Sequence, residues 1–301
     1  MTDGTVLITG SSGLIGIAVT NRLMNMGIAC LGIDLRAPEN EHRIDICDTA
    51  RLAPFMNGVA GIIHLAAVSR VIYGEHDPDL CHAVNVDATR GILETALEAP
   101  QLPWLIYASS REVYGQQDRL PVSEDAMFRP LNAYARSKVE AELLIGKARE
   151  ASLRTAILRF STVYGSVDDH QDRVVPAFTV AAAHGGTLRV DGADCCFDVT
   201  HVDDVAIGVA QVVELLMSGE RMLPPIHFVS GRRTTLLDLA RKANEIGGSK
   251  GRIHTAAPRT FDVHNFVGDP ERARALLGWQ ATTDLHTGLS RLALEFLKCA
   301  R

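Results

Sequence analysis

Short apolar runs alternate along this chain with longer segments in which apolar residues recur every three or four positions. The short runs predict buried strands, and the longer periodic segments predict amphipathic helices. Strands that alternate with helices in this order favour parallel βαβ units, so we expect an α/β fold with a doubly wound parallel sheet. The expected strands lie near residues 6–9, 29–33, 61–68, 104–108, 155–160 and 226–229.

The helical pattern is regular in the first half of the chain and less regular afterwards. Periodicity becomes irregular between residues 166 and 194, which indicates a smaller second part built from long connections. The expected helices lie near residues 17–26, 49–56, 78–99, 132–149, 174–183, 205–217, 236–246 and 285–298.

Three glycines, Gly10, Gly13 and Gly16, follow the first expected strand and open the first expected helix. A turn without Cβ atoms lets phosphates approach the backbone, and the helix N-terminus offers free N–H groups and a positive dipole end. Glycines with this spacing can also serve only to make a tight βα turn. In the strand–turn–helix context we interpret them as a dinucleotide site in a Rossmann-like fold.

The second expected strand ends at Asp34. An acidic side chain there suits a ribose 2′-hydroxyl and repels a 2′-phosphate, which favours NAD over NADP, although Arg36 lies close enough to weaken that preference. Asp45 is placed to reach an adenine amino group, with Ile46 packing on the ring. Asp48 is expected to cap the helix that follows.

We therefore expect a dinucleotide-binding domain and a smaller C-terminal substrate lobe. The domain spans residues 1–165 and is rejoined by about 198–246. The lobe takes 166–197 and about 247–284, and residues 285–301 form a C-terminal helix.

Composition excludes several classes of protein. The net charge of −6 offers no basic footprint for nucleic acid and no polybasic patch for a membrane surface. No apolar run reaches the roughly 18 residues of a membrane helix, and no secretory signal is expected because the N-terminus lacks a basic and an apolar region.

The six cysteines show no C-x-x-C spacing, which favours free thiols in a reducing cytoplasm. The acidic loop around Asp168 is interpreted as solvated, so no metal site is expected.

A loop with reactive groups follows the strand that ends at Ala108. Ser109, Ser110, Arg111 and Glu112 place two hydroxyls, a guanidinium and a carboxylate at the carboxyl end of a strand, which makes this loop a candidate reaction site.

Tyr134 and Lys138 stand four residues apart at the start of the next helix, so they share one helical face. For an arbitrary Y-x-x-x-K pair, an aromatic ring resting on a lysine stem is the more frequent explanation.

Taken together, these motifs resemble those of the extended short-chain dehydrogenase/reductases, the nucleotide-sugar epimerase/dehydratase family. The resemblance covers nearly the whole chain, and it makes a structural explanation of the Tyr134–Lys138 pair improbable. It rests on these motifs, in this order: Thr9-Gly10-x-x-Gly13-x-x-Gly16, Asp34, Asp45-Ile46, His64-Leu65-Ala66-Ala67, Asn85, Ser110 with Val113-Tyr114-Gly115, Tyr134-x-x-x-Lys138, His201-Val202-Asp203-Asp204 and Leu277-Gly278-Trp279.

The resemblance implies roles for three catalytic residues. Tyr134 would take the proton of a sugar hydroxyl as hydride moves to NAD, and Ser110 would hold the same hydroxyl. A free tyrosine has a pKa of about 10, so the ammonium of Lys138 would favour the tyrosinate. The expected cofactor contacts are Gly10, Ser12, Gly13, Leu14, Ile15, Gly16, Asp34, Arg36, Asp45, Ile46, Leu65, Ala66, Ala67, Asn85, Tyr134 and Lys138, and the expected substrate contacts are Ser109, Arg111, Thr162 and Arg259.

Several reactions remain open on this resemblance. We place a 4-epimerase, acting through a transient 4-keto sugar, ahead of a 4,6-dehydratase or uronate decarboxylase that would use Glu112 as an additional catalytic group. Where relatives have arginine and asparagine near the diphosphate, this chain has Phe197 and Thr162, so a dehydrogenase of a small sugar acid or polyol is a further alternative. A non-catalytic NAD(H) sensor would be expected to lose Tyr134 or Lys138. The resemblance also implies a homodimer joined by helices near residues 85–99 and 134–149.

Overall fold

The computed structural model describes residues 4–221 and 223–299. These residues form two compact units, each assembled from separated stretches of the chain. The first unit comprises residues 4–115, 124–160, 206–221 and 223–227. The second unit comprises residues 116–123, 161–205 and 228–299.

The first unit is built on a six-stranded sheet, as the alternating apolar runs predict. Its strand order is β2-β1-β3-β4-β5-β10, and the register from β2 through β5 is parallel throughout. The order in which strands are added to the sheet reverses at β1, because β2 lies on one side of β1 and β3 on the other. The strands are β1 (Val6–Thr9), β2 (Cys30–Ile33), β3 (Gly61–His64), β4 (Trp104–Ser110), β5 (Thr155–Phe160) and β10 (Ile226–Phe228).

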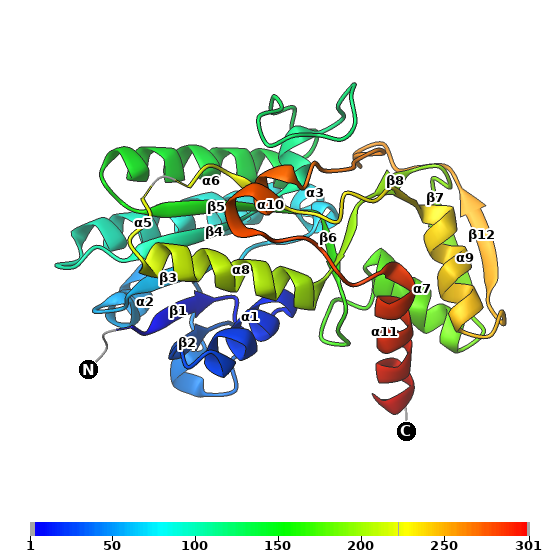
Figure 1. Cartoon of the computed structure of the whole chain (residues 1–301), viewed down its shortest axis with the longest axis horizontal. Helices are drawn as coiled ribbons and strands as arrows, with labels where there is room; N and C mark the ends of the chain where they lie inside the picture. The colour runs from blue at the N-terminus through cyan, green and yellow to red at the C-terminus, as the bar shows by residue number, and fades with distance from the viewer. Residues whose placement is uncertain (1–3, 222, 300–301) are drawn as a thin grey trace. The chain divides into compact units, whose positions relative to one another are not determined.

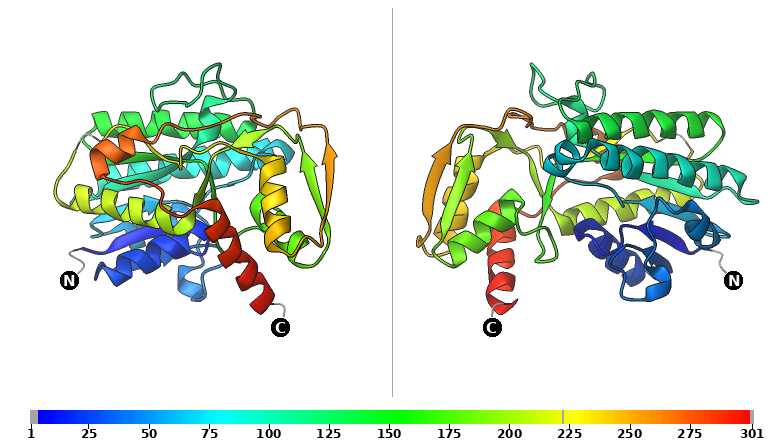
Figure 2. Two further views of the ribbon diagram at one scale, coloured as in Figure 1. Left: turned by 45° about the vertical axis from the view of Figure 1, so that its right-hand side comes forward. Right: turned by 180° about the vertical axis from the view of Figure 1, so that it is seen from behind.

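Helices cover both faces of this sheet, which confirms the doubly wound α/β class (Figures 1 and 2). The helix expected over residues 78–99 is divided by a π-helical turn, η2, into α4 and α5. The helical elements of this unit are α1 (Leu14–Asn25), η1 (Asn40–His42), α2 (Thr49–Met56), α3 (Val71–His76), α4 (Pro78–His82), η2 (Ala83–Asp87), α5 (Ala88–Glu98), η3 (Arg111–Tyr114), α6 (Ala133–Glu150) and most of α8 (Val202–Met217).

Alternating residues of the strands bury two apolar faces. On one face Leu7, Ile62 and Tyr107 join side chains from α2, α5 and α6 in a single core cluster, and all three are at most 1% exposed. The helices α1 and α8 lie on the other side of the sheet (Figure 1). The parallel register brings the carboxyl ends of β1, β3 and β4 to one edge, which is where ligands bind in folds of this kind.

The second unit has its own core around α7, α9 and α11. Phe178, Leu188, Leu239 and Leu292 are each at most 4% exposed and belong to one buried cluster. Its elements are β6 (Thr162–Tyr164), α7 (Val174–Ala183), β7 (Thr187–Asp191), β8 (Cys196–Phe197), β9 (Val199–His201), β11 (Thr234–Thr235), α9 (Leu236–Ile246), β12 (Arg252–Ala256), α10 (Glu271–Leu277) and α11 (Leu285–Cys299).

The bounds of these units differ from the expected domain bounds. The segments 116–123, 161–165, 198–205 and 228–246 belong to the second unit, whereas the sequence analysis placed them in the dinucleotide-binding domain. For the segment 228–246 the reason is the apolar face of α9, which buries Leu239 and Ala243 in the cluster around α7. The assignment of cofactor binding to one unit and substrate binding to the other stays a prediction.

Within residues 4–221 and 223–299, no helix combines the length and the apolar character that crossing a membrane would require.

Candidate active site

Ser110 is the last residue of β4 and begins the turn that the sequence marks as a reaction site. Its Oγ accepts a hydrogen bond from the backbone N–H of Glu112 at 3.2 Å and so caps the short helix η3. The side chain is 9% exposed, at the carboxyl edge of the sheet. The next residue inward, Ser109, donates a short hydrogen bond of 2.5 Å to Glu142 Oε1, so its hydroxyl faces α6.

The helix α6 carries the tyrosine and the lysine. It begins after Asn132, whose Oδ1 accepts the backbone N–H of Ala135 at 2.8 Å in the manner of an N-cap. Tyr134 lies in the first turn and Lys138 one turn later, so the two side chains share a face. Both are buried, with 8% and 4% of their surfaces exposed.

The ammonium group of Lys138 lies inside the unit, between two aromatic rings. Its Nζ donates a hydrogen bond of 2.8 Å to the carbonyl oxygen of Ala108 on β4. The same nitrogen lies 4.8 Å from the ring centroid of Tyr107 and 5.9 Å from that of Tyr134. A cation at this distance from the phenol ring favours the tyrosinate form, which a general base requires.

Burial controls the protonation of this lysine. Loss of hydration disfavours the ammonium and lowers the pKa of Lys138 from 10.5 to about 8, against the opposing effects of Cys81 and Glu142. The ammonium is therefore protonated at neutral pH but loses its proton in a mildly alkaline range.

Glu112 makes one contact within its own turn and a second with the residue that caps α6. Its Oε1 lies 3.1 Å from a guanidinium nitrogen of Arg111, and its Oε2 accepts a hydrogen bond of 3.3 Å from Asn132 Nδ2. Because Asn132 caps α6, this carboxylate stabilises the start of the helix that carries Tyr134. The guanidinium of Arg111 offsets its charge in a region where Glu112 is only 6% exposed.

The three glycines of the first loop differ in whether the fold leaves room for a side chain. A Cβ on Gly10 would lie 2.6 Å from the backbone nitrogen of Ala66, and one on Gly16 would lie 2.2 Å from the carbonyl oxygen of Gly10. A Cβ on Gly13 would meet only that same oxygen, at 3.3 Å. Gly10 and Gly16 are thus required by the fold itself, whereas Gly13 leaves space at the N-terminus of α1.

This N-terminus fits a pyrophosphate. Gly13 is the N-cap of α1, and no side chain in the described part of the chain caps the helix there. The first N–H groups of α1, from Leu14 to Gly16, therefore belong to the part of a helix that binds anions. The residues present fit a dinucleotide.

The carboxylate of Asp34 lies beside the glycine loop. It accepts hydrogen bonds from the backbone N–H groups of Ser12, at 3.1 Å, and of Arg36, at 2.8 Å. The Arg36 guanidinium donates to the carbonyl oxygen of Ser12 at 2.8 Å. A carboxylate offers about four acceptor positions, so Asp34 retains capacity for a ribose hydroxyl.

The other expected cofactor contacts differ in exposure. Asp45 is exposed and accepts the backbone N–H of Cys47 at 2.9 Å, while Ile46 is 5% exposed within the apolar core. Leu65, Ala66 and Ala67 directly follow β3 at the carboxyl edge and are partly buried. The contacts of these residues with a cofactor stay predictions.

Two of the expected substrate contacts, Thr162 and Arg259, lie in the second unit. Arg259 is paired with Asp262, with 2.6 Å between Nε and Oδ2. Phe197 packs against the core of this unit, and the neighbouring Asp198 is fully buried. Asp198 accepts hydrogen bonds from the backbone N–H groups of Ser230 and Gly231, each at 2.7 Å. The residue before it is Phe197, which supplies no guanidinium group.

The sequence analysis missed two groups that hold α6 in place. The carbonyl oxygen of Ala108 has no signature in the sequence, because any residue type supplies one. Asn132 did have a signal, since asparagine directly before a helical pattern is a favoured N-cap.

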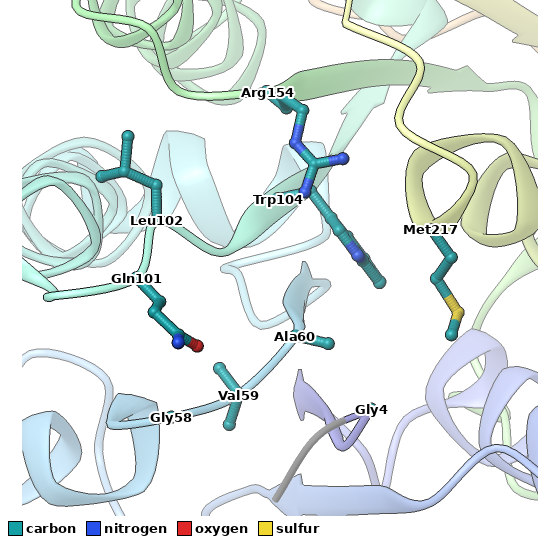
Figure 3. A pocket seen from close by; sticks show the side chains of 9 residues that line it. All are labelled: Gly4, Gly58, Val59, Ala60, Gln101, Leu102, Trp104, Arg154 and Met217. Carbon is teal, nitrogen blue, oxygen red and sulfur yellow. The ribbon is translucent and has the colours of Figure 1, made fainter.

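A pocket at the opposite edge of the sheet is unrelated to this site. It is lined by residues that precede or begin strands, among them Ala60 before β3, Trp104 at the start of β4 and Arg154 before β5 (Figure 3). Since the strands are parallel, these positions mark their amino ends. Ser110 marks the carboxyl end.

Comparison with known proteins agrees with this geometry. The sequence matches the NAD dependent epimerase/dehydratase family over residues 6–223. It is 29% identical to the UDP-glucose 4-epimerase of Mycolicibacterium smegmatis over 314 residues, which cover 97% of this chain and 98% of that protein.

Solved structures of similar fold include proteins of different activity. MoeE5, in complex with UDP-glucuronic acid and NAD, has a TM-score of 0.91 and 26% sequence identity over 98% of this chain and 100% of its own. DesIV, a dTDP-glucose 4,6-dehydratase from Streptomyces venezuelae with NAD bound, has a TM-score of 0.87 and 25% identity over 98% of this chain and 97% of its own.

We expect activity to fall as the pH rises through about 8, because Lys138 then loses the charge that favours the tyrosinate. The pH dependence of kcat/KM measures this. Lys138 does not itself destabilise the fold in this range. Between about 8 and 10.5 the unfolded chain binds more protons at this group, so its contribution makes the native state more stable as the pH rises. A profile that stays flat to pH 10 contradicts the role of this lysine.

Proposed function

The chain belongs to the NAD-dependent epimerase/dehydratase family, of the extended short-chain dehydrogenase/reductase type, and we propose that it is a nucleotide-sugar 4-epimerase. The observation that carries the proposal is the buried ammonium of Lys138 beside Tyr134, at the carboxyl edge of a sheet that also carries the glycine loop. Enzymes of this family depend on NAD.

The chain's own groups divide the acid–base work. When bound, NAD supplies a reversible acceptor for hydride from the sugar carbon. Tyr134 removes the proton of the sugar hydroxyl, and the Lys138 ammonium stabilises the phenolate. Ser110 donates a hydrogen bond to the same sugar oxygen, where charge develops. Rotation of the keto sugar and reversal of these steps gives the epimer.

The contacts of Glu112 favour epimerisation over elimination. A dehydratase or decarboxylase of this family would use a carboxylate near this position in catalysis. In this chain both oxygens of Glu112 are in contacts, with Arg111 and with the α6 cap Asn132. To act on a substrate as an acid or a base, Glu112 would have to give up one of these two contacts.

The favoured substrate is a UDP-hexose or a UDP-uronic acid. Relatives of this chain include UDP-glucose 4-epimerases, and MoeE5 was solved with UDP-glucuronic acid. Phe197 supports a second candidate, a sugar acid or polyol without the nucleotide, since phenylalanine cannot bind a diphosphate as the arginine of relatives would. Thr162, Arg259, Ser109 and Arg111 stay proposals as substrate contacts.

Replacing Tyr134→Phe or Lys138→Met should abolish nearly all turnover while leaving NAD binding in place. Loss of a positioned acid–base group costs roughly 10²–10⁴-fold in rate. The measurement is the interconversion of UDP-glucose and UDP-galactose, and of the two matching uronates, with NAD binding measured by titration.

Arg136→Gln is a matched control, because this exposed residue lies between the two on the same helix. It should retain full activity. Full activity in Tyr134→Phe would instead remove the tyrosine from the mechanism.

Reaction in deuterated water separates epimerisation from elimination. Simple 4-epimerisation exchanges no carbon-bound hydrogen with solvent, so we expect no deuterium at C5 of the product by mass spectrometry and NMR. Glu112→Gln should keep more than about a tenth of the wild-type kcat, because a glutamine oxygen still accepts from Asn132. Deuterium at C5 together with an inactive Glu112→Gln variant would show an elimination chemistry instead.

We also propose a cytoplasmic homodimer that joins through α5 and α6. Support comes from α6, where Leu143 is 59% exposed, and from α4, which packs on α6 and leaves Leu80 52% exposed. Exposed apolar side chains of this size are typical of an interface where they form one contiguous patch. Light scattering should give twice the chain mass of 32.6 kDa, and Leu143→Glu should shift it toward the monomer. A monomeric wild type contradicts the proposal.

A further inference from the structure

Three polar side chains are buried together between β1, β3 and α5. Thr9, His64 and Thr89 are at most 1% exposed. His64 is the last residue of β3, Thr9 is the last residue of β1, and Thr89 lies in the first turn of α5. Buried polar groups are expensive unless each is hydrogen-bonded, so the placement of their protons can be derived.

The direction of the hydrogen bonds follows from one carbonyl group. The hydroxyl of Thr89 donates to the carbonyl oxygen of Asn85 at 2.8 Å, which uses its only proton. His64 Nε2, 3.0 Å from the same hydroxyl, therefore carries a proton and donates to it. At the other side of a neutral ring, His64 Nδ1 accepts from the Thr9 hydroxyl at 2.7 Å.

The imidazole is neutral in this environment. Burial, and secondly the ammonium of Lys138, lower the pKa of His64 to about 3. The other titratable ring that faces it is Tyr107, with 5.8 Å between ring centroids. A single neutral tautomer, protonated at Nε2, satisfies every partner.

The chain of hydrogen bonds continues from Asn85 to the catalytic helix. Asn85 lies in the π-helical turn η2, and its side-chain amide exchanges two hydrogen bonds with the backbone of Val68, at 2.8 and 3.1 Å. Its Nδ2 also donates to Ser137 Oγ at 2.9 Å. Ser137 in turn donates to the carbonyl oxygen of Tyr134 at 2.8 Å.

The glycine loop joins the other end of the same chain. The hydroxyl of Thr9 accepts the backbone N–H of Ala66 at 3.3 Å. Ala66 is the residue against which Gly10 packs so closely that no Cβ would fit. A directed series of hydrogen bonds therefore connects the glycine loop and the segment after β3 with the backbone of Tyr134.

We propose that His64 is a positioning residue, a fixed Nε2–H tautomer that links the glycine loop to α6 and so sets the place of Tyr134 relative to a bound dinucleotide. The inference rests on the proposed function of Tyr134 as the base. His64 itself bonds two hydroxyls that are buried in the protein, so it acts through its neighbours rather than on a substrate.

Thr89→Val tests this link, since valine removes the hydroxyl and keeps the shape. We expect kcat to fall about tenfold with KM little changed, because displacement of a catalytic group lowers the rate more than substrate binding. Thr89→Ser restores the hydroxyl and should recover most of the activity. Thr95→Val is the matched control, because Thr95 lies on the same helix and bonds the carbonyl oxygen of Gly91 at the same 2.8 Å.

The rate is measured per mole of folded enzyme, which circular dichroism and NAD titration determine. Equal kcat in Thr89→Val and Thr95→Val would reduce the link to a contribution to stability and overturn the proposal. An inactive wild type would instead defeat the proposed function and leave the link to be tested by the tautomer alone.

The tautomer has its own spectroscopic signature. In wild-type protein labelled with ¹⁵N-histidine, the ring of His64 should show a protonated Nε2 and an unprotonated Nδ1 that do not change from pH 5 to 9. His64→Asn identifies its signals by their absence. A ring that titrates in this range, or one protonated at Nδ1, contradicts the proposal whatever the activity.

Discussion

The hydrogen bond from Lys138 Nζ to the carbonyl oxygen of Ala108 is the contact on which the rest of the site depends. Burying an ammonium costs roughly several kcal/mol unless polar groups replace its water. One carbonyl and the faces of two phenol rings do so here, and these groups belong to β4 and α6. The cation is therefore retained only when β4 and α6 keep this position relative to each other, and the same position places Tyr134.

A second buried charge fixes α6 one turn further along. Glu142 receives two hydrogen bonds from the guanidinium of Arg159, at 2.9 and 2.6 Å, and a third from Ser109. The bidentate geometry fixes both distance and orientation between α6 and β5. Tyr134, Lys138 and Glu142 thus form a row on one helical face. Glu142 anchors the helix, and Lys138 supplies the positive charge.

The sequence predicted local features of this arrangement far better than tertiary ones. The strands, the helix α6 and the shared face of Tyr134 and Lys138 follow from periodicity and spacing, which are properties of neighbouring residues. The π-helical turn that contains Asn85 does not follow from them, because Asn85 is bonded to the backbone of Val68, 17 residues earlier. The core against which α9 packs could not be predicted either, since an amphipathic helix shows that it buries a face but not against which core. The adenine contact expected of Ile46 stays a prediction, because an apolar side chain at the end of a segment suits a ligand and a core equally.

The position of Tyr134 at the start of a helix explains why so many polar contacts gather there. The first turn of a helix lacks partners for its N–H groups and frays easily. In this chain Asn132 caps the turn, Glu75 accepts the backbone N–H of Ala133 at 2.7 Å, and Ser137 binds the carbonyl of Tyr134. A base on a frayed turn would sample many positions, whereas a base on a turn held at three points keeps one. The buried polar groups around α6 therefore hold this helix end in one position, as the proposed acid–base role of Tyr134 requires.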